Sequence, residues 1–322
     1  MTCVAGLARG LARIAGTVFL VSTLCWCLVE AAPGSLVERA ARTGGQLPAD
    51  PGRIALDTRR VILQQVAATH GLEGGPTERM SRRLTDLLAL ELGTSWRDGR
   101  PVGEALQRTA PATLLLWTLA LSLALLLGGA FALAAARAPG GRLDAVLSAL
   151  AACAFAVPPV WLALLALGVF ADGHPWRLLP PEGLDSVSAL ILPVAVLACL
   201  PTFVVARHAR AAFVVASRSP WAIAAVARGN SRDRVLLVHV VRASVGPLAA
   251  LVPVLAAYLL AATMVVEEVF GIPGVGALLL EAALRGDAPV VVGVAALSGA
   301  LVAMSSSVAE WVHRWADPRV RR

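Results

Sequence analysis

The sequence contains no lysine and few charged residues of any kind. Asp, Glu, Lys and Arg together make up 15% of its 322 residues, against about 25% in soluble domains. Without lysine the chain cannot form a G-x-x-x-x-G-K-[ST] phosphate-binding loop, so it does not bind ATP through such a loop. The absence of lysine also excludes a lysine Schiff base. Hydrophobic residues reach 57% before glycine is counted, which is more apolar surface than a soluble globule of this size can bury. The composition therefore indicates an integral membrane protein.

Metal-ligating residues are scarce and badly spaced for binding a metal ion. Cys25 and Cys27, the closest pair among five cysteines, lie two residues apart and face different directions on a helix. The five histidines show no metal-ligand spacing and lie near span ends or in loops. We expect neither a metal ion nor a cofactor, and we interpret the cysteines as small apolar residues.

Six apolar runs are long enough to cross a hydrocarbon core of about 30 Å as helices. We therefore expect an all-α integral membrane protein with six transmembrane helices. The first run follows Arg9 and Arg13 and could be a signal peptide, but its length and the poor cleavage site at residues 31–32 favour an uncleaved span. The six spans are predicted over residues 14–31, 112–136, 145–171, 187–206, 248–266 and 290–309.

Arginine is distributed unevenly among the short segments that flank and join the six spans. One set of segments holds 15 arginines and four acidic residues, and the other set holds two arginines and seven acids. Arginine-rich short loops stay on the cytoplasmic side of a membrane, so we expect both termini in the cytosol. The arginine-rich set comprises residues 1–13, 137–144, 207–242 and 310–322, and the acidic set comprises residues 172–186 and 267–289.

A long polar segment separates the first two spans and is expected on the outer side of the membrane. Residues 32–111 mix arginines and acids almost evenly, which is typical of a small solvated subdomain. Amphipathic patterns predict helices within it at 61–69 and 81–92, separated by a break rich in Gly and Pro. Residues 112–319 then hold the five remaining spans, and a tail at 320–322 follows.

The most informative region is the arginine-rich loop at residues 207–247. Ser219 is a typical N-cap residue and Pro220 suits the first helical position, so an Ala-rich helix is expected to begin there. Gly229 suits the left-handed position that ends a helix, and Ser231 can cap a second helix. Such a short, rigid helix could dock into a soluble partner and act as a lever, or it could lie on anionic lipid through its arginines.

The spacing of residues in this loop resembles that of the permease subunits of ABC importers, in particular the dipeptide/oligopeptide/nickel branch. That branch carries an Ala-rich helix followed by Gly, then His ten residues later, Arg three later and Pro five later. Here the Gly is Gly229, and the positions after it are His239, Arg242 and Pro247. The acidic residue that opens the motif in many ABC permeases is absent, and Ala224 lies in its place. Further similar stretches lie at residues 92–95, 99–102, 268–276 and 317–319.

The resemblance implies an ABC type I importer permease, whose transmembrane helices are joined by a cytoplasmic coupling-helix loop. Such a chain pairs with a second homologous permease subunit in the bacterial inner membrane. Two cytoplasmic ABC ATPase subunits hydrolyse ATP, and an extracytoplasmic solute-binding protein delivers a peptide-like or related small solute. The chain itself would be a transport subunit embedded in the lipid bilayer, would not be an enzyme, and would bind no nucleic acid.

The resemblance also implies roles for residues of the loop. Ala225 and Ala227 would be small contacts that let the ATPase approach closely, and Gly229 would be the corner after the helix. The arginines would contact either the ATPase or lipid headgroups. The full ATPase-coupling set is Pro220, Ala224, Ala225, Ala227, Arg228, Gly229, Arg232 and Arg234.

Other polar residues are open to more than one interpretation. His239, in the motif with Arg242 and Pro247, is interpreted as a structural hydrogen-bonding residue rather than a proton carrier. Tyr258 and Thr263 in the fifth span could line the pathway, although their separation by five residues keeps them off one tight face. Three acids at the outer ends of spans five and six could form a gate, contact the binding protein, or be solvated loop residues. They are Glu267, Glu268 and Asp287.

Two rival interpretations are an ion-coupled secondary transporter and an intramembrane serine protease. The first needs ionisable groups near the centre of a span, and the six predicted spans contain none there. The second needs a base beside a serine, and no histidine lies in mid-membrane near Ser122 or the serines at 305–307. The sequence therefore favours an importer permease over both.

Overall fold

Helices make up nearly all of the structure. The computed structural model describes residues 2–33, 35–48, 56–89, 91–170 and 186–316. Among these residues, extended pairing is limited to an isolated bridge between Thr94 and Pro101, so the expected all-α architecture is confirmed. Most of the expected outer loop at 172–186 lies outside the described residues, as do the stretch at 317–319 and the tail at 320–322.

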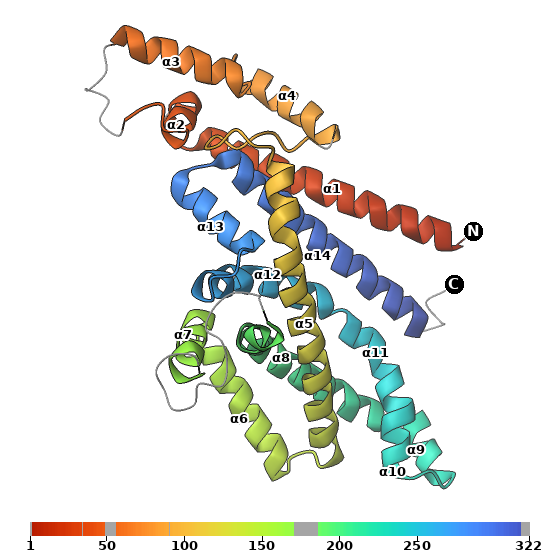
Figure 1. The fold of residues 1–322 in the computed structure, drawn as a ribbon. Coiled ribbons are helices and arrows are strands. Elements are labelled where there is room, and N and C mark those ends of the chain that lie inside the picture. Colours follow the sequence, from red (N-terminus) through yellow and green to blue (C-terminus); the bar gives the residue numbers. More distant parts are fainter. Residues whose placement is uncertain (1, 34, 49–55, 90, 171–185, 317–322) are drawn as a thin grey trace. The chain divides into compact units, whose positions relative to one another are not determined.

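Figure 1 shows the order of the helices along the chain. The outer segment forms helices close to the predicted ones, but α3 and α4 begin earlier than the amphipathic patterns indicated. The helices are α1 (Thr2–Ala31), α2 (Leu36–Thr43), α3 (Leu56–Thr69), α4 (Pro76–Leu88), α5 (Val102–Arg137), α6 (Arg142–Ala156), α7 (Pro159–Phe170), the 3-10 helix η2 (Val187–Leu190), α8 (Ile191–Ser217), α9 (Pro220–Ala227), α10 (Arg232–Arg234), the π-helix η3 (Val235–Val240), α11 (Val241–Ala249), α12 (Val252–Val269), α13 (Val275–Arg285) and α14 (Ala288–Ala316).

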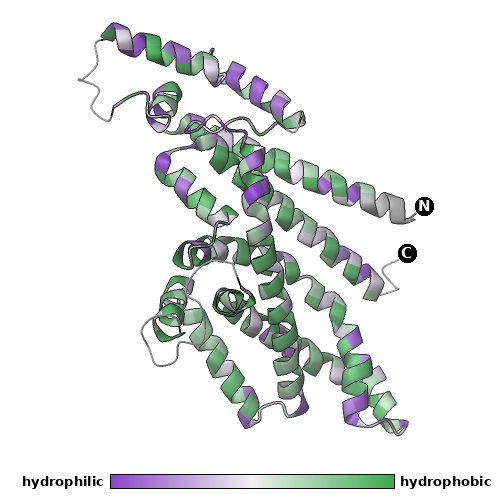
Figure 2. Cartoon of the chain, in the orientation of Figure 1, coloured by the Kyte–Doolittle hydropathy of each residue, from purple (hydrophilic) through white to green (hydrophobic). Residues whose placement is uncertain are grey.

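Five helices of the described chain are long and apolar enough to cross a membrane, and the bent pair α6–α7 raises the number to six. Figure 2 shows hydrophobic residues along these helices and hydrophilic residues along α4. The third span differs from the continuous helix expected at 145–171, because the chain bends by 101° between α6 and α7. The expectation of a continuous helix was therefore wrong, and Pro158 and Pro159 explain the bend. Proline lacks a backbone N–H and disfavours the helical conformation in the residue before it. Val157 is accordingly extended, with ψ of 117°.

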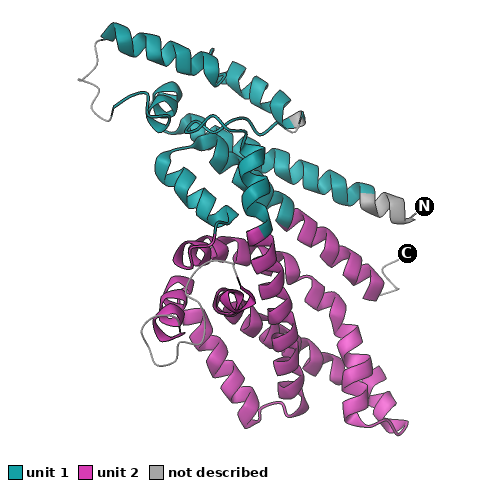
Figure 3. Ribbon diagram, viewed as in Figure 1, with its two compact units in different colours: residues 1–111, 273–301 teal, residues 112–272, 302–322 magenta. Residues whose placement is uncertain are grey.

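The chain divides into two compact units, which Figure 3 colours separately. Unit 1 comprises residues 1–111 and 273–301. Its largest hydrophobic cluster joins Trp26 of α1 to Val66 of α3 and to Trp96, in the turn that precedes α5. The outer segment is therefore packed onto the end of the first span.

Two arginines of α4 contact α1 and so stabilise the packing of the outer segment on the first span. The guanidinium carbon of Arg83 lies 5.0 Å from the centre of the Trp26 ring, within the range of a cation–π contact. A nitrogen of the same group donates a hydrogen bond to the carbonyl oxygen of Leu92 at 2.7 Å. Burial lowers the pKa of Arg83, but a guanidinium retains its proton in proteins. One turn earlier, Arg79 forms an ion pair with Glu30 at the end of α1.

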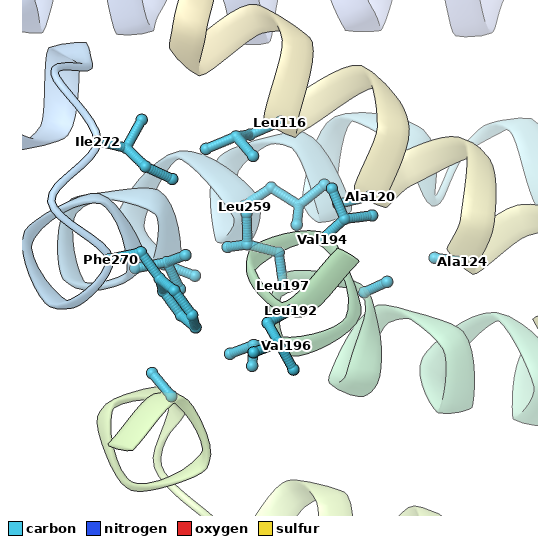
Figure 4. Packing of buried hydrophobic residues seen from close by; sticks show 14 residues of the cluster. Leu116, Ala120, Ala124, Leu192, Val194, Val196, Leu197, Leu259, Phe270 and Ile272 are labelled. Atoms are coloured by element: carbon cyan, nitrogen blue, oxygen red, sulfur yellow. The ribbon is translucent and has the colours of Figure 1, made fainter. Parts of the chain in front are cut away.

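Unit 2 comprises residues 112–272 and 302–322. Its main core is built from the apolar faces of α5, α7, α8 and α12. Figure 4 shows Leu116 of α5, Leu197 of α8 and Leu259 of α12 within this cluster. Alanines fill the positions between the large side chains, which lets the helices approach one another closely.

Helices α5 and α8 lie close together at Gly128. A Cβ atom added to this glycine would lie 2.6 Å from the carbonyl oxygen of Thr202 and 2.7 Å from Cβ of Val205. Backbone atoms cannot move aside as a flexible side chain does, so α8 leaves no room for a methyl group here. The next residue, Gly129, has no atom within 4 Å of such a Cβ.

We predict that Gly128→Ala destabilises the helix pair by about 1–3 kcal/mol, the usual cost of forcing extra atoms into a packed site. Gly129→Ala is the matched control on the same helix, and it should be neutral or stabilise the chain because alanine favours helix. Thermal unfolding of the purified chain in detergent measures both. Equal midpoints for the two variants would contradict the close approach.

Candidate functional site

Helix α9 in the arginine-rich loop begins and ends as the sequence predicts. Ser219 is extended and Pro220 opens the helix, although the hydroxyl of Ser219 donates back to the carbonyl oxygen of Ala216 at 2.6 Å and does not cap α9. At the other end Gly229 has φ of +93°, in the left-handed region. The N–H of Gly229 donates to the carbonyl oxygen of Val226 at 2.9 Å, so the glycine turns the chain and satisfies a terminal carbonyl.

One face of α9 consists of alanines packed against the chain itself. Ala222 is 1% exposed and Ala225 is 5% exposed, and both belong to a cluster with Phe213 of α8 and Leu236 of η3. The expected role of Ala225 as a contact for the ATPase therefore needs correction. Its small side chain lets α9 approach α8 and η3 of its own chain.

The opposite face of α9 is apolar and open. A helix turns 100° per residue, so Ile223, Ala224 and Ala227 lie opposite the two buried alanines. All three side chains are exposed, and Ile223 is 60% exposed. We call the face formed by Pro220, Ile223, Ala224 and Ala227 the outer face of α9. It offers a short apolar surface that carries no charged side chain.

The segment after Gly229 differs from the single second helix that was expected. Ser231 does cap α10, since its Oγ accepts from the N–H of Arg234 at 3.3 Å. The backbone then becomes π-helical over Val235–Val240 before α11 begins. A π-helix has more residues per turn, and its buried residues Val235, Leu236 and Val240 follow that longer spacing.

Two ion pairs connect this loop region to other helices of unit 2. Nε of Arg137, the last residue of α5, lies 3.1 Å from Oδ1 of Asp233, the middle residue of α10. Both side chains are exposed, so the pair contributes at most about 1 kcal/mol and acts mainly by orienting α10. Near the N-terminus of α6, the nearly buried Asp144 accepts from Arg210 of α8 at 2.5 Å and from the N–H of Gly140 at 2.8 Å.

The sequence did not single out the Asp144–Arg210 pair. Its signal was available, because Asp144 is one of only four acids in the arginine-rich segments. An acid surrounded by so many cations on one side of a membrane has a high chance of being paired, and here the pair joins α6 to α8.

The remaining motif residues lie together beside α9. His239, Arg242 and Pro247 line a groove of about 530 Å³ that also includes Trp221 and His313. His239 was expected to be a structural hydrogen-bonding residue; its side chain is exposed, and no hydrogen bond of it is found within the described residues. Arg228, Arg232 and Arg234 are likewise exposed on the loop.

The pattern of the family described as "Binding-protein-dependent transport system inner membrane component" matches residues 124–322, which include α9, the glycine corner and the groove. The chain belongs to this family. It is therefore a membrane permease subunit of the ABC importer class and not a member of an enzyme family.

Curated relatives of this permease match between 76% and 95% of its length. It is 26% identical to the oligopeptide transport system permease protein AppB of Bacillus subtilis over 85% of this chain and 90% of AppB. It is 27% identical to the dipeptide transport system permease protein DppB of Lactococcus lactis over 95% of both chains. It is 29% identical to the glutathione transport system permease protein GsiC of Pectobacterium atrosepticum over 76% of this chain and 80% of GsiC.

Two polar residues expected near the pathway of this permease are buried in unit 2. Glu267 is fully buried near the end of α12, and its Oε1 accepts from the hydroxyl of Thr113 at 2.6 Å. It is thus not a solvated loop acid, whereas Glu268 beside it is exposed. Thr263 is buried as well, and its hydroxyl donates to the carbonyl oxygen of Leu260 in the same helix at 2.8 Å. Tyr258 is half-buried at the edge of the main core.

Asp287 serves a structural purpose in unit 1. Its carboxylate is 3% exposed and accepts from the hydroxyl of Ser95 at 2.5 Å and from the N–H of Trp96 at 3.1 Å. These bonds hold the turn closed by the Thr94–Pro101 bridge against the start of α14. The solvated-acid interpretation of Asp287 is therefore wrong.

Charged groups surround this turn in unit 1. A shallow groove of about 200 Å³ lies beside it and includes Arg108, Glu281 and Arg285. Glu281 pairs with Arg285 at 3.2 Å and with Arg97 at 2.5 Å, and all three side chains are well exposed. Burial lowers the pKa of His70, the residue directly after α3, and the negative charge of Asp287 opposes this shift more weakly.

No group of three His, Cys, Asp or Glu residues in the described chain could hold a metal ion. Cys25, Cys27, Cys153 and Cys199 are free thiols.

We predict that Asp287→Ala lowers the stability of the permease by about 2 kcal/mol, because it leaves two donors of the turn buried without an acceptor. The control is Glu281→Ala, which removes only exposed ion pairs and should change stability by less than about 1 kcal/mol. Thermal unfolding in detergent compares them. An Asp287→Ala midpoint no lower than that of Glu281→Ala would refute the structural role.

Proposed function

We propose that this permease forms half of the translocation pathway of an ATP-driven importer, and that α9 is its coupling helix. The outer face of α9 seats in a groove of a cytoplasmic ATPase subunit, while a second, homologous permease subunit supplies the other half of the pathway. The observation that carries this proposal is the two-sided packing of α9. Ala222 and Ala225 seal one face against the chain, and the opposite face is apolar and exposed.

The packing of α9 suits it to transmit movement. Proline at its start and glycine after its end limit its length, and its inner face packs against α8 and η3. The cluster around Phe213 and Leu236 and the ion pairs of Asp233 and Asp144 link the loop to α5, α6 and α8. A displacement of α9 by the ATPase therefore passes to these helices as a rigid-body movement.

ATP supplies the free energy without acting on this chain. An ATPase dimer that closes on ATP favours one conformation of the attached permease pair, and hydrolysis restores the other. The two conformations open the pathway to opposite sides of the membrane. This arrangement matches a chain whose composition provides no phosphate-binding loop of its own.

The solute proposed is peptide-like and is delivered by an extracytoplasmic binding protein. The names of the relatives refer to oligopeptide, dipeptide and glutathione transport, which supports this class. The arginine-rich loops support an orientation with both termini in the cytosol of a bacterial cell, and α9 on the same side as the ATPase.

The ion-coupled alternative gains little from the structure. Glu267 is a buried acid, but it lies two residues before the end of α12 and not at the centre of the span. Coupling by a proton or sodium ion requires an ionisable group at mid-depth. The buried position of Glu267 therefore fits a role in packing the end of the helix.

We predict that Gly229→Val uncouples transport. A β-branched residue at φ of +93° costs about 1–2 kcal/mol, so the corner rearranges and α9 tilts away from its seat. In proteoliposomes with the ATPase, partner permease and binding protein, we expect ATP-dependent uptake of labelled peptide to fall about tenfold or more. ATP hydrolysis should continue without stimulation by the loaded binding protein.

The control for this variant is Gly229→Asn, because asparagine tolerates the left-handed region and should keep most of the uptake. Normal uptake by Gly229→Val would contradict the role of the corner. Solute movement by the purified permease alone, driven by an ion gradient, would contradict the importer itself.

A further inference from the structure

The groove beside α9 contains the motif residues that have no role in the proposed contact between α9 and the ATPase. His239, Arg242 and Pro247 lie along η3 and α11, and the far wall is formed by His313 and Ala316 at the end of α14. The groove has a volume of about 530 Å³, and all of its lining residues belong to unit 2. Its lining residues are Trp221, Val238, His239, Arg242, Ala243, Gly246, Pro247, His313 and Ala316.

The polar groups of the groove are hydrogen-bond donors with a net positive charge. Arg242 carries a guanidinium, and each imidazole of His239 and His313 has at least one N–H. None of the lining residues is acidic. Arg242 and His239 are exposed, and neither has a hydrogen-bond or ion-pair partner among the described residues. Among the described residues, the lining of the groove therefore supplies positive charge without an acidic side chain to balance it.

The position of His313 is fixed by a close contact with α11. A Cβ atom added to Gly246 would lie 2.5 Å from Nδ1 of His313 and 2.9 Å from its Cε1. The imidazole ring thus rests directly on the helix backbone where any other residue would displace it. Glycine at this position keeps one donor of the groove in place.

Tryptophans mark the depth of the groove in the membrane. Trp311 and Trp315, in the last two turns of α14, are 62% and 61% exposed, and His313 lies between them in the sequence. Exposed tryptophans at the end of an apolar span lie at the level of the lipid headgroups. Trp221 and Val238, both exposed, add apolar side chains to the lining of the groove beside the basic ones.

We propose that this groove binds the phosphate of an anionic phospholipid headgroup in the leaflet on the side of α9. The planar guanidinium of Arg242 can hold two phosphate oxygens at once, and the histidines donate to the others. The apolar walls fit the first carbons of the acyl chains. Basic pockets between spans at the cytoplasmic surface are suited to such headgroups. Because Trp221 of α9 is one of the lining residues, a lipid bound in the groove would contact the coupling helix and restrict its movement.

The test measures lipid binding by the purified full-length chain, without ATP or solute. Native mass spectrometry in detergent micelles compares retention of phosphatidylglycerol with retention of zwitterionic phosphatidylcholine. We expect preferential retention of phosphatidylglycerol, an approximately tenfold weaker affinity in Arg242→Gln, and a smaller loss in His313→Ala. The matched control is Arg142→Gln, which removes an exposed arginine of another cytoplasmic segment and should change nothing.

Several outcomes would overturn the site. Equal retention of both lipids, or equal loss in Arg242→Gln and Arg142→Gln, would mean nonspecific attraction to basic loops. Displacement of phosphatidylglycerol by millimolar inorganic phosphate would identify a free-phosphate site instead. Loss of the bound lipid when the ATPase subunit is added would assign the groove to an acidic segment of that protein. Thermal unfolding of each variant checks that it is folded, so that a loss of lipid binding is not caused by unfolding.

Discussion

Helix α9 touches the rest of the chain through alanine side chains, and this close contact decides which residues the helix can offer to a partner. Ala222 and Ala225 bring its backbone near to α8 and η3, where a larger side chain would force it away. Once that face is sealed, the turn of the helix puts Ile223, Ala224 and Ala227 on the open side. The alanines of α9 therefore have two roles: those on one face pack against the chain, and those on the other face remain exposed for a partner.

The charges of the permease are arranged to suit this helix. Arginines are concentrated in the same short segments as α9, and two of the four acids in those segments, Asp144 and Asp233, form ion pairs with Arg210 of α8 and Arg137 of α5. In unit 1 the carboxylate of Asp287 accepts hydrogen bonds that hold a turn, and in unit 2 the carboxylate of Glu267 accepts a hydrogen bond from Thr113. The acids that looked available for a gate thus act as internal acceptors, and the exposed acid that remains beside them is Glu268.

Local sequence signals predicted much of this structure because they depend on neighbouring residues. The apolar runs, the proline start of α9 and its glycine end could be recognised without knowledge of tertiary contacts, and the family match supports the resemblance of the loop. Three features could not be predicted from the sequence, because each depends on what packs against the segment. They are the bend between α6 and α7, the π-helix, and the burial of Ala225 against its own chain. The role of α9 in coupling stays a prediction.

The most direct measurement of that role is a cysteine cross-link between α9 and the ATPase subunit that assembles with this permease. In a background without the native cysteines, Ile223→Cys lies on the outer face of α9 and Ala222→Cys lies on the sealed face. The account predicts that a short bifunctional reagent joins the chain to the ATPase from position 223 and not from position 222. Cross-linking from 222 alone, or from neither position in the assembled transporter, would contradict it.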